Sequence, residues 1–177
     1  NPVYAGTCAH LSPEEIAERM KMRRPAIRLR VPDDTISIWD RQYGEYSEYM
    51  PRDCGDFIIR RSDGLFGYQL AVVVDDGAMG VTQVVRGSDL LDSTPRQLWL
   101  QERLGLPHPE YGHVPLLLAP DGRRLAKRDR DQELGQLQSR FTAPQIVGTL
   151  AHAAGLLDRE EEVAPEELLP LFRWDKL

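Results

Sequence analysis

Residues 64–91 read GLFGYQLAVVVDDGAMGVTQVVRGSDLL, and this stretch decides how the rest of the chain is interpreted. The β-branched run at residues 81–85, between Gly80 and Gly87, predicts a strand buried on both faces. Arg86 follows at the carboxyl end of that strand, which is where open α/β sheets bind ligands. An arginine at this position also fits a simpler interpretation, in which a strand-end side chain reaches solvent.

The neighbouring run Leu70–Val74 is also strand-like in composition. Only residues 75–80 separate it from the next run, whereas a parallel crossover needs about a dozen residues or more. The run is therefore either the first arm of a hairpin or a buried helix that ends at Gly80. Its valines favour the strand, and periodicity cannot decide over so short a run.

Composition limits the class of protein. The chain has 177 residues, of which 41% are apolar, enough to bury the core of a domain. No apolar run approaches the ~20 residues that span a bilayer, so we expect a soluble protein with no membrane partner. Cys8 and Cys54 do not have the spacing of a disulfide framework, which favours the cytoplasm. Because the chain starts at Asn1 without a methionine or a signal-like segment, we expect it to be a piece of a longer protein.

The net charge of −6 argues against a surface that is basic throughout. Basic residues nevertheless gather in two clusters, one within residues 19–30 and one within residues 123–130. A charge run of this kind is usually a solvated face.

Capping signals predict an early helix. Ser12 is the expected N-cap, Pro13 the first helical residue and Glu15 the third, which together complete a capping box. Ile16 and Met20 are expected on the inner face of this helix.

Two later helices have similar signals. Thr94 is expected to cap one that ends at Gly105, and Thr142 to cap another that ends at Gly155. A shorter helix is expected from Pro165.

Strand signals lie on both sides of the central stretch. Residues 26–31 alternate as in a half-buried strand, and residues 35–39 are expected to be its antiparallel partner. Residues 56–61 followed by the turn at residues 62–64 predict another hairpin, and residues 113–118 predict a buried strand. The early pieces indicate a small β subdomain.

The central stretch resembles two sequence blocks of the glutamyl-tRNA synthetase family of class I aminoacyl-tRNA synthetases. These blocks are Tyr-x-x-Ala-x-Val-Val-Asp-Asp, matched from Tyr68, and Val-x-Arg-Gly-x-Asp-Leu-Leu, matched around Arg86. The similarity continues in order through residues 93–97, 113–118 and 121–128. It implies an α/β fold, the C-terminal half of a Rossmann-type catalytic domain with a small β insertion and a short helical tail.

The same resemblance implies that the chain is divided into three parts. Residues 1–55 would hold the end of a zinc-binding segment and the small β insertion. Residues 56–130 would form the second half of the catalytic domain, and residues 131–177 the helical C-terminal tail.

The resemblance also implies roles for particular residues. Arg86 and Tyr68 would bind L-glutamate, through the guanidinium and the hydroxyl respectively. The run Arg124-Leu125-Ala126-Lys127-Arg128 is similar to the family's Lys-Met-Ser-Lys-Ser loop, which meets the triphosphate of ATP. Arg124 replaces the first lysine and Ala126 the serine, so the catalytic and ATP-binding role transfers to Lys127.

A metal site is implied for the amino-terminal segment. In the glutamyl-queuosine branch of the family, an upstream Cys-x-Cys pair joins a Tyr-x-x-x-Cys to bind one structural zinc ion, and Tyr4 and Cys8 match the second half of that pattern. Without the resemblance, Cys8 would be interpreted as a small buried hydrophobe. His10 is a rival ligand.

The activity that the resemblance implies is ATP-dependent activation of L-glutamate, with Mg²⁺, and transfer of the glutamyl group to the queuosine base of tRNA(Asp). The alternatives are an ordinary glutamyl-tRNA synthetase, which acts on tRNA(Glu), and a non-catalytic tRNA-binding module of the same fold. We expect a monomer, and we expect the His-Ile-Gly-His part of the active site to lie upstream. The chain by itself is expected to be inactive.

Overall fold

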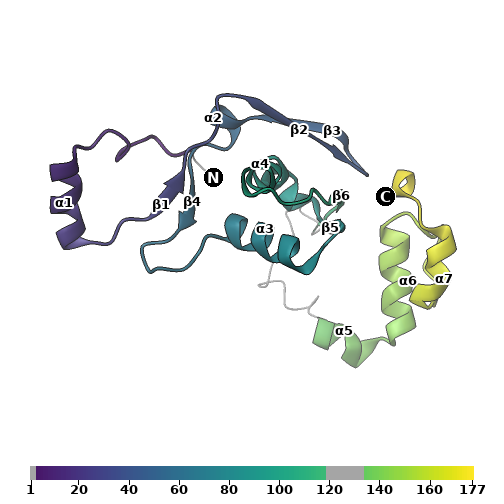
Figure 1. The fold of residues 1–177 in the computed structure, drawn as a ribbon. Coiled ribbons are helices and arrows are strands. Elements are labelled where there is room, and N and C mark those ends of the chain that lie inside the picture. Colours follow the sequence, from purple (N-terminus) through teal and green to yellow (C-terminus); the bar gives the residue numbers. More distant parts are fainter. Residues whose placement is uncertain (1–2, 119–133) are drawn as a thin grey trace. The chain divides into compact units, whose positions relative to one another are not determined.

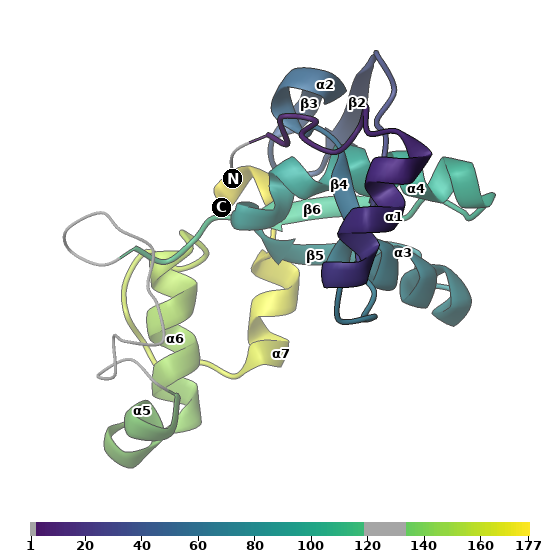
Figure 2. The same cartoon turned by 90° about the vertical axis from the view of Figure 1, so that its left-hand side faces the viewer.

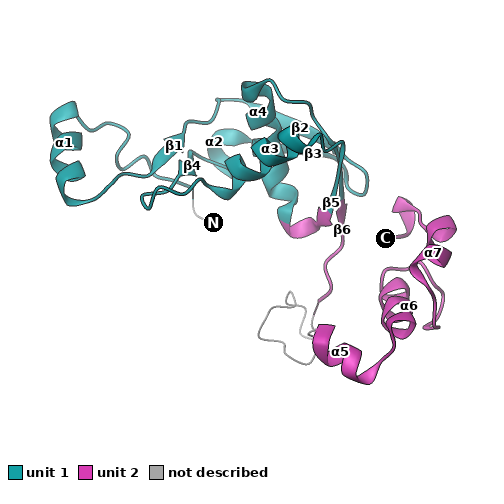
Figure 3. Ribbon diagram, turned by 60° about the horizontal axis from the view of Figure 1, so that its bottom comes forward, with its two compact units in different colours: residues 1–85, 90–112 teal, residues 86–89, 113–177 magenta. Residues whose placement is uncertain are grey.

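The computed structural model describes residues 3–118 and 134–177 (Figure 1). The chain forms two compact units: residues 1–85 with 90–112, and residues 86–89 with 113–177 (Figure 3). Tyr4, Cys8 and Tyr68 belong to the first unit, whereas Arg86 belongs to the second. In the described ranges, no helix is both long enough and apolar enough to cross a bilayer.

The strands β2 (Thr35–Asp40) and β3 (Gly44–Tyr49) form an antiparallel hairpin, and the short helix α2 (Met50–Asp53) follows it. The Asp40 carboxylate accepts hydrogen bonds from the backbone N–H groups of Gln42 and Tyr43, which closes the turn. The expected pairing of residues 35–39 with residues 26–31 is therefore wrong. The strand β3 escaped prediction because its sequence, GEYSEY, has little apolar content.

The sheet has four strands in the order β3-β2-β6-β5, where β5 is Gln83–Gly87 and β6 is Glu110–Val114. β2 and β6 are parallel. β5 is last in the order and alternates between exposed and half-buried residues, with Val85 62% exposed, so the prediction of burial on both faces is wrong. The prediction for residues 113–118 is also displaced, because β6 ends at Val114 and both Leu117 and Leu118 are exposed.

A second, two-stranded sheet pairs β1 (Ile27–Leu29) antiparallel with β4 (Phe57–Arg60). The alternation of residues 26–31 correctly indicated a strand, although its partner is about thirty positions further along the chain. The hairpin predicted after β4 is confirmed, because the turn brings Phe66 back to pair with Arg60.

Residues 68–79 form the helix α3 (Tyr68–Met79), so the preference for a strand at Leu70–Val74 is wrong and the helix alternative is right. Gly80 ends the helix in the left-handed conformation, with a φ of 68°, as that alternative required. Val73 is 1% exposed and belongs to the core of the first unit. Burial in this core outweighs the low helix propensity of consecutive valines. The buried core members are Phe57, Val73, Trp99 and Leu100.

The helix α1 (Pro13–Met22) begins with the predicted capping box. Ser12 Oγ accepts from the Glu15 N–H at 3.2 Å, and Glu15 Oε2 accepts from the Ser12 N–H at 2.8 Å. None of its residues is buried, so the inner face predicted for Ile16 and Met20 is wrong in this structure. Figure 1 shows the reason: α1 lies at one end of the first unit, with β1 and β4 between it and α3.

The helix α4 (Thr94–Leu104) ends at Gly105 as predicted, but its start differs. Thr94 is the first helical residue rather than the N-cap, and its hydroxyl donates to the Leu90 carbonyl at 3.3 Å. The cause is a 3₁₀ turn, η1 (Ser88–Ser93), which leads directly into the helix.

The second unit contains the helical tail, α5 (Leu134–Arg140), α6 (Ala143–Ala153) and α7 (Pro165–Leu168). α6 begins with the predicted Thr142–Gln145 capping box, and α7 begins at Pro165 as predicted. Figures 1 and 2 show α6 and α7 side by side. Short 3₁₀ turns, η3 (Leu169–Leu171) and η4 (Trp174–Lys176), follow.

Candidate functional site

Tyr68 is the first residue of α3, and its position depends on Gly67. Gly67 is buried and caps the helix; its N–H donates to the Ile59 carbonyl of β4 at 2.9 Å. A Cβ at residue 67 would lie 2.3 Å from the carbonyl oxygen of Ile58, so only glycine permits this approach. Tyr68 itself is 54% exposed, and its hydroxyl forms no hydrogen bond with the residues that the structure describes. The side chain is therefore available to a ligand.

A chain of part-buried side-chain hydrogen bonds lies next to Tyr68. Gln69 donates through Nε2 to Ser93 Oγ at 3.0 Å, and Gln97 donates through Nε2 to Gln69 Oε1 at 2.7 Å. Gln97 is 2% exposed, so this bond is protected from water. It ties the start of α3 to α4 and thereby fixes the backbone that carries Tyr68. Sequence reasoning missed this connection, because nothing in the sequence sets Gln69 and Gln97 apart from the other polar residues of the two helices.

Arg86 occupies β5 and is part-buried. Its Nε donates to Nε2 of His113 at 3.0 Å, and His113 is fully buried at the end of β6. The bond requires a lone pair on His113 Nε2, so the ring proton sits on Nδ1. This contact orients the guanidinium plane. The simpler interpretation of Arg86, as a side chain that only reaches solvent, does not account for its bond to a buried histidine. The sequence marks residue 113 only as the start of an expected strand.

The chain approaches itself closely just after Arg86. A Cβ at Gly87 would lie 2.7 Å from Asp89 Oδ1 and 2.9 Å from Leu116 Cδ2. Gly87 therefore lets the backbone beside Arg86 pack against its own unit.

The loop predicted to meet ATP, Arg124-Leu125-Ala126-Lys127-Arg128, lies outside the described residues. The role of Lys127 therefore stays a prediction.

The Tyr4–Cys8 segment forms a tight turn in which the tyrosine hydroxyl accepts a hydrogen bond from the Cys8 N–H at 2.8 Å. Cys8 is exposed, and its sulfur accepts from Arg19 Nη1 at 3.7 Å. A phenol oxygen and an exposed thiol on one turn have the chemistry of zinc ligands. The described residues contain no group of three or more His, Cys, Asp or Glu side chains that could hold a metal, so Tyr4 and Cys8 are two members of a larger ligand set in any such site.

The second cysteine belongs to a buried polar cluster around Glu48. Tyr46 Oη donates to Glu48 Oε1 at 3.0 Å, and Glu48 is 5% exposed. Burial raises the pKa of the Glu48 carboxyl, against the opposing effects of the Tyr46 hydrogen bond and the charge of Arg96. Burial also raises the pKa of the Cys54 thiol to about 11. Cys54 therefore remains a protonated thiol near neutral pH and is a poor metal ligand.

Comparison with known proteins gives the family. Residues 1–147 match the family described as tRNA synthetases class I (E and Q), catalytic domain. The chain belongs to this family. The chain has the fold that the resemblance implied: a glutamate tRNA ligase from Elizabethkingia meningosepticum, solved in complex with its amino acid, matches 96% of the chain with a TM-score of 0.74 and 26% identity. The match covers 38% of that structure.

Curated relatives are more similar in sequence. The chain is 50% identical over 173 residues to the Glutamyl-Q tRNA(Asp) synthetase of Symbiobacterium thermophilum, a match that covers 97% of this chain and 53% of that protein. It is 51% identical over 155 residues to the protein of the same name from Ectopseudomonas mendocina, covering 86% of the chain and 52% of that protein. The chain thus spans about half the length of the curated relatives it matches.

Proposed function

We propose that this chain is part of an enzyme that activates L-glutamate with ATP and transfers the glutamyl group to the queuosine base of tRNA(Asp). The observation that carries the proposal is the 50% identity, over 97% of the chain, to a protein named Glutamyl-Q tRNA(Asp) synthetase. Identity to the glutamate tRNA ligase of similar fold is 26%. Sequence similarity at this level favours the queuosine acceptor over tRNA(Glu).

Arg86 would hold a carboxylate of the glutamate substrate. A guanidinium binds a carboxylate through two parallel N–H···O bonds, and this geometry needs the guanidinium plane to be oriented before the substrate arrives. The bond from Arg86 Nε to His113 supplies that orientation. His113 is then a positioning residue for Arg86.

Tyr68 would donate its hydroxyl to the same substrate, from a backbone fixed by Gly67 and by the Gln69–Gln97 bond. In the activation step an oxygen of the glutamate carboxylate attacks the α-phosphate of ATP, and pyrophosphate leaves. Lys127 would stabilise the negative charge on the reacting phosphates, with Mg²⁺. Positioning and charge stabilisation account for this chemistry without a general acid or base from the chain.

Tyr4 and Cys8 would supply two ligands to one structural zinc ion. A thiolate and a phenolate oxygen are chemically suited to zinc, and the hydrogen bond between Tyr4 and the Cys8 N–H already closes the turn that carries both. The metal would stabilise the fold of this segment and take no part in the reaction.

The proposal is tested on the intact protein by glutamate-dependent exchange of pyrophosphate into ATP in the absence of tRNA. We expect exchange without tRNA, followed by glutamylation of tRNA(Asp) that carries queuosine. The same tRNA without queuosine is the matched control and should accept nothing. Exchange that appears only when tRNA(Glu) is added, with charging of tRNA(Glu), would instead identify an ordinary glutamyl-tRNA synthetase.

A further inference from the structure

A buried carboxylate in the β2–β3 hairpin lacks one of its hydrogen bonds. Glu48 of β3 is 5% exposed. Its Oε1 accepts from the Tyr46 hydroxyl at 3.0 Å, whereas Oε2 is buried and has no hydrogen-bond partner among the described residues. Burying an acceptor without a partner costs stability, because the water that solvated it is not replaced. Stability of the hairpin therefore does not account for a carboxylate at this position.

A positive charge on α4 acts on this carboxylate. Burial raises the pKa of the Glu48 carboxyl, and the Tyr46 hydrogen bond and the charge of Arg96 oppose that shift. The described structure contains no direct ion pair between Glu48 and Arg96, and Arg96 Nε is also buried without a hydrogen-bond partner there. The pair thus leaves one acceptor and one donor unsatisfied. Such a pair orients its members through charge at a cost in stability.

Arg96 also holds the 3₁₀ turn η1, which precedes α4. Its Nη2 donates to the carbonyl of Asp92 at 3.2 Å. In the same turn, Ser93 Oγ donates to Asp92 Oδ1 at 3.3 Å and accepts from Gln69 Nε2 at 3.0 Å. Gln69 directly follows Tyr68 in α3. These contacts therefore connect β3 to the start of α3 through a single turn of chain.

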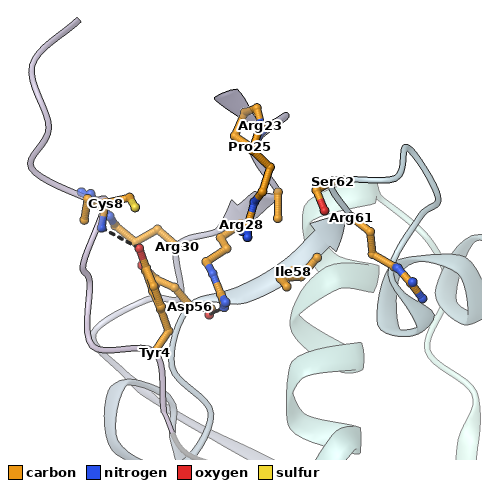
Figure 4. Close-up of a pocket in the computed structure, with 12 residues that line it drawn as sticks. Tyr4, Cys8, Arg23, Pro25, Arg28, Arg30, Asp56, Ile58, Arg61 and Ser62 are labelled. Atoms are coloured by element: carbon orange, nitrogen blue, oxygen red, sulfur yellow. Dashed lines mark hydrogen bonds between the residues drawn. The ribbon is translucent and has the colours of Figure 1, made fainter. Parts of the chain in front are cut away.

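The neighbour of Arg96 on α4 holds the same point of α3 from a second side. Gln97 donates through Nε2 to Gln69 Oε1 at 2.7 Å. All these residues belong to the first compact unit. None of them lines the basic cavity of about 650 Å³ beside the Tyr4–Cys8 turn (Figure 4). Substitutions in this connection therefore leave the lining of that cavity intact.

We propose that Glu48 and Arg96 are positioning residues for Tyr68, and that they act on glutamate binding through η1 and Gln69. The inference rests on the proposed function for the role of the Tyr68 hydroxyl. A hydroxyl that donates to a substrate loses most of the bond when the angle or distance is wrong, so a shift at the start of α3 weakens glutamate binding. The charge of Glu48 keeps Arg96 in place, and Arg96 keeps η1 in place.

The test removes both charges of the pair together, in the intact protein. The variant is Glu48→Gln with Arg96→Met; it keeps the net charge, and a glutamine oxygen can still accept from Tyr46. The matched control is Arg41→Met with Glu110→Gln, which removes an exposed ion pair from the same unit. Glutamate-dependent pyrophosphate exchange gives kcat and the KM for glutamate and for ATP, and thermal unfolding gives the melting temperature.

We expect the KM for glutamate to rise roughly three- to tenfold in the pair variant, as the weakening of one hydrogen bond to the substrate predicts. Both kcat and the KM for ATP should stay within about twofold of wild type, as should all three values in the control. The melting temperature of the pair variant should equal or exceed that of wild type, because neutral groups of similar size often replace a buried charge pair without loss of stability. A lower melting temperature and a lower kcat, with the KM for glutamate unchanged, would assign the pair a purely structural role and overturn the proposal.

A double-mutant cycle shows whether the pair acts through Tyr68. In a Tyr68→Phe background the hydroxyl is absent, so its alignment no longer matters. The pair substitutions should then raise the KM for glutamate by less than about twofold. The same increase in both backgrounds would mean that the pair acts independently of Tyr68, contrary to the proposal.

Amide hydrogen–deuterium exchange tests the same connection without relying on activity. The amides of residues 68–72 should exchange faster in the pair variant than in wild type or the control, because the start of α3 opens more readily when η1 is not held. Unchanged protection of these amides would overturn the proposal. If the pair variant does not fold, Glu48→Gln alone is judged by the same criteria. If wild type shows no glutamate-dependent pyrophosphate exchange, the proposed function fails, while amide protection still decides whether the pair holds the start of α3.

Discussion

Replacing Arg86 by alanine is the sharpest test of the substrate site. If the guanidinium pairs with the glutamate carboxylate in a partly desolvated site, its removal leaves that carboxylate unpaired, at a cost of about 3–5 kcal/mol in transition-state binding. At about 1.4 kcal/mol for each factor of ten, kcat/KM for glutamate should fall by roughly a hundred- to several-thousand-fold. The assay is steady-state pyrophosphate exchange on the intact enzyme with varied glutamate.

Controls separate recognition from loss of structure. Arg86 also bonds to the buried His113, so the melting temperature is measured alongside activity. Arg86→Lys should restore little, because an ammonium group cannot form the two parallel bonds. Arg41→Ala is the matched control: Arg41 forms an exposed ion pair with Glu110 at 2.7 Å, and its loss should change kcat/KM by less than about threefold. An Arg86→Ala enzyme within tenfold of wild type would refute the assignment of Arg86 as the substrate anchor.

Three further changes test other parts of the molecule. Lys127→Ala should lower kcat in the same assay and leave the KM for glutamate nearly unchanged, because its charge matters most as charge develops on the phosphates; a change confined to KM would contradict this. Cys8→Ser should lower the zinc content of the intact protein measured by atomic absorption, and an unchanged content would remove Cys8 from the ligand set. Glu48→Gln should be more stable than wild type at neutral pH, and its free energy of unfolding should depend less on pH. Burial raises the pKa of the Glu48 carboxyl in the folded protein above its value in the unfolded chain. The wild-type protein therefore loses stability as the pH rises from the unfolded pKa through the folded pKa. Urea unfolding between pH 4 and 8 measures this, and a parallel pH profile for the two proteins would be the contrary result.

Short-range signals predicted the helix boundaries that depend on neighbouring residues. The capping boxes at Ser12 and Thr142, and the glycine ends at Gly80 and Gly105, are interactions within one turn of chain. The sequence pattern therefore predicts these interactions without any knowledge of the tertiary fold. Thr94 is the exception, because the 3₁₀ turn before it changes which residue starts the helix.

In the candidate site, too, the sequence predicted some features and missed others. The order of the sequence blocks was enough to name Tyr68 and Arg86, together with the family to which the chain belongs. The partners that fix these residues, Gln97 and His113, are 28 and 27 positions away from the residues they bond. No periodicity or local motif contains that information, because such contacts exist only once the strands and helices have packed.

The sequence by itself determined the family, the helix caps and the residues that are candidates for glutamate binding. Only the tertiary structure decided that Leu70–Val74 is helical and that β1 pairs with β4. It also decided that three arginines of the basic segment 19–30 line one cavity together with Arg61, with Arg28 held against Tyr4. The physical reason is the same in each case. A short apolar or charged run is compatible with several backbone conformations and partners, and the choice among them is made by burial and pairing with segments distant in the chain.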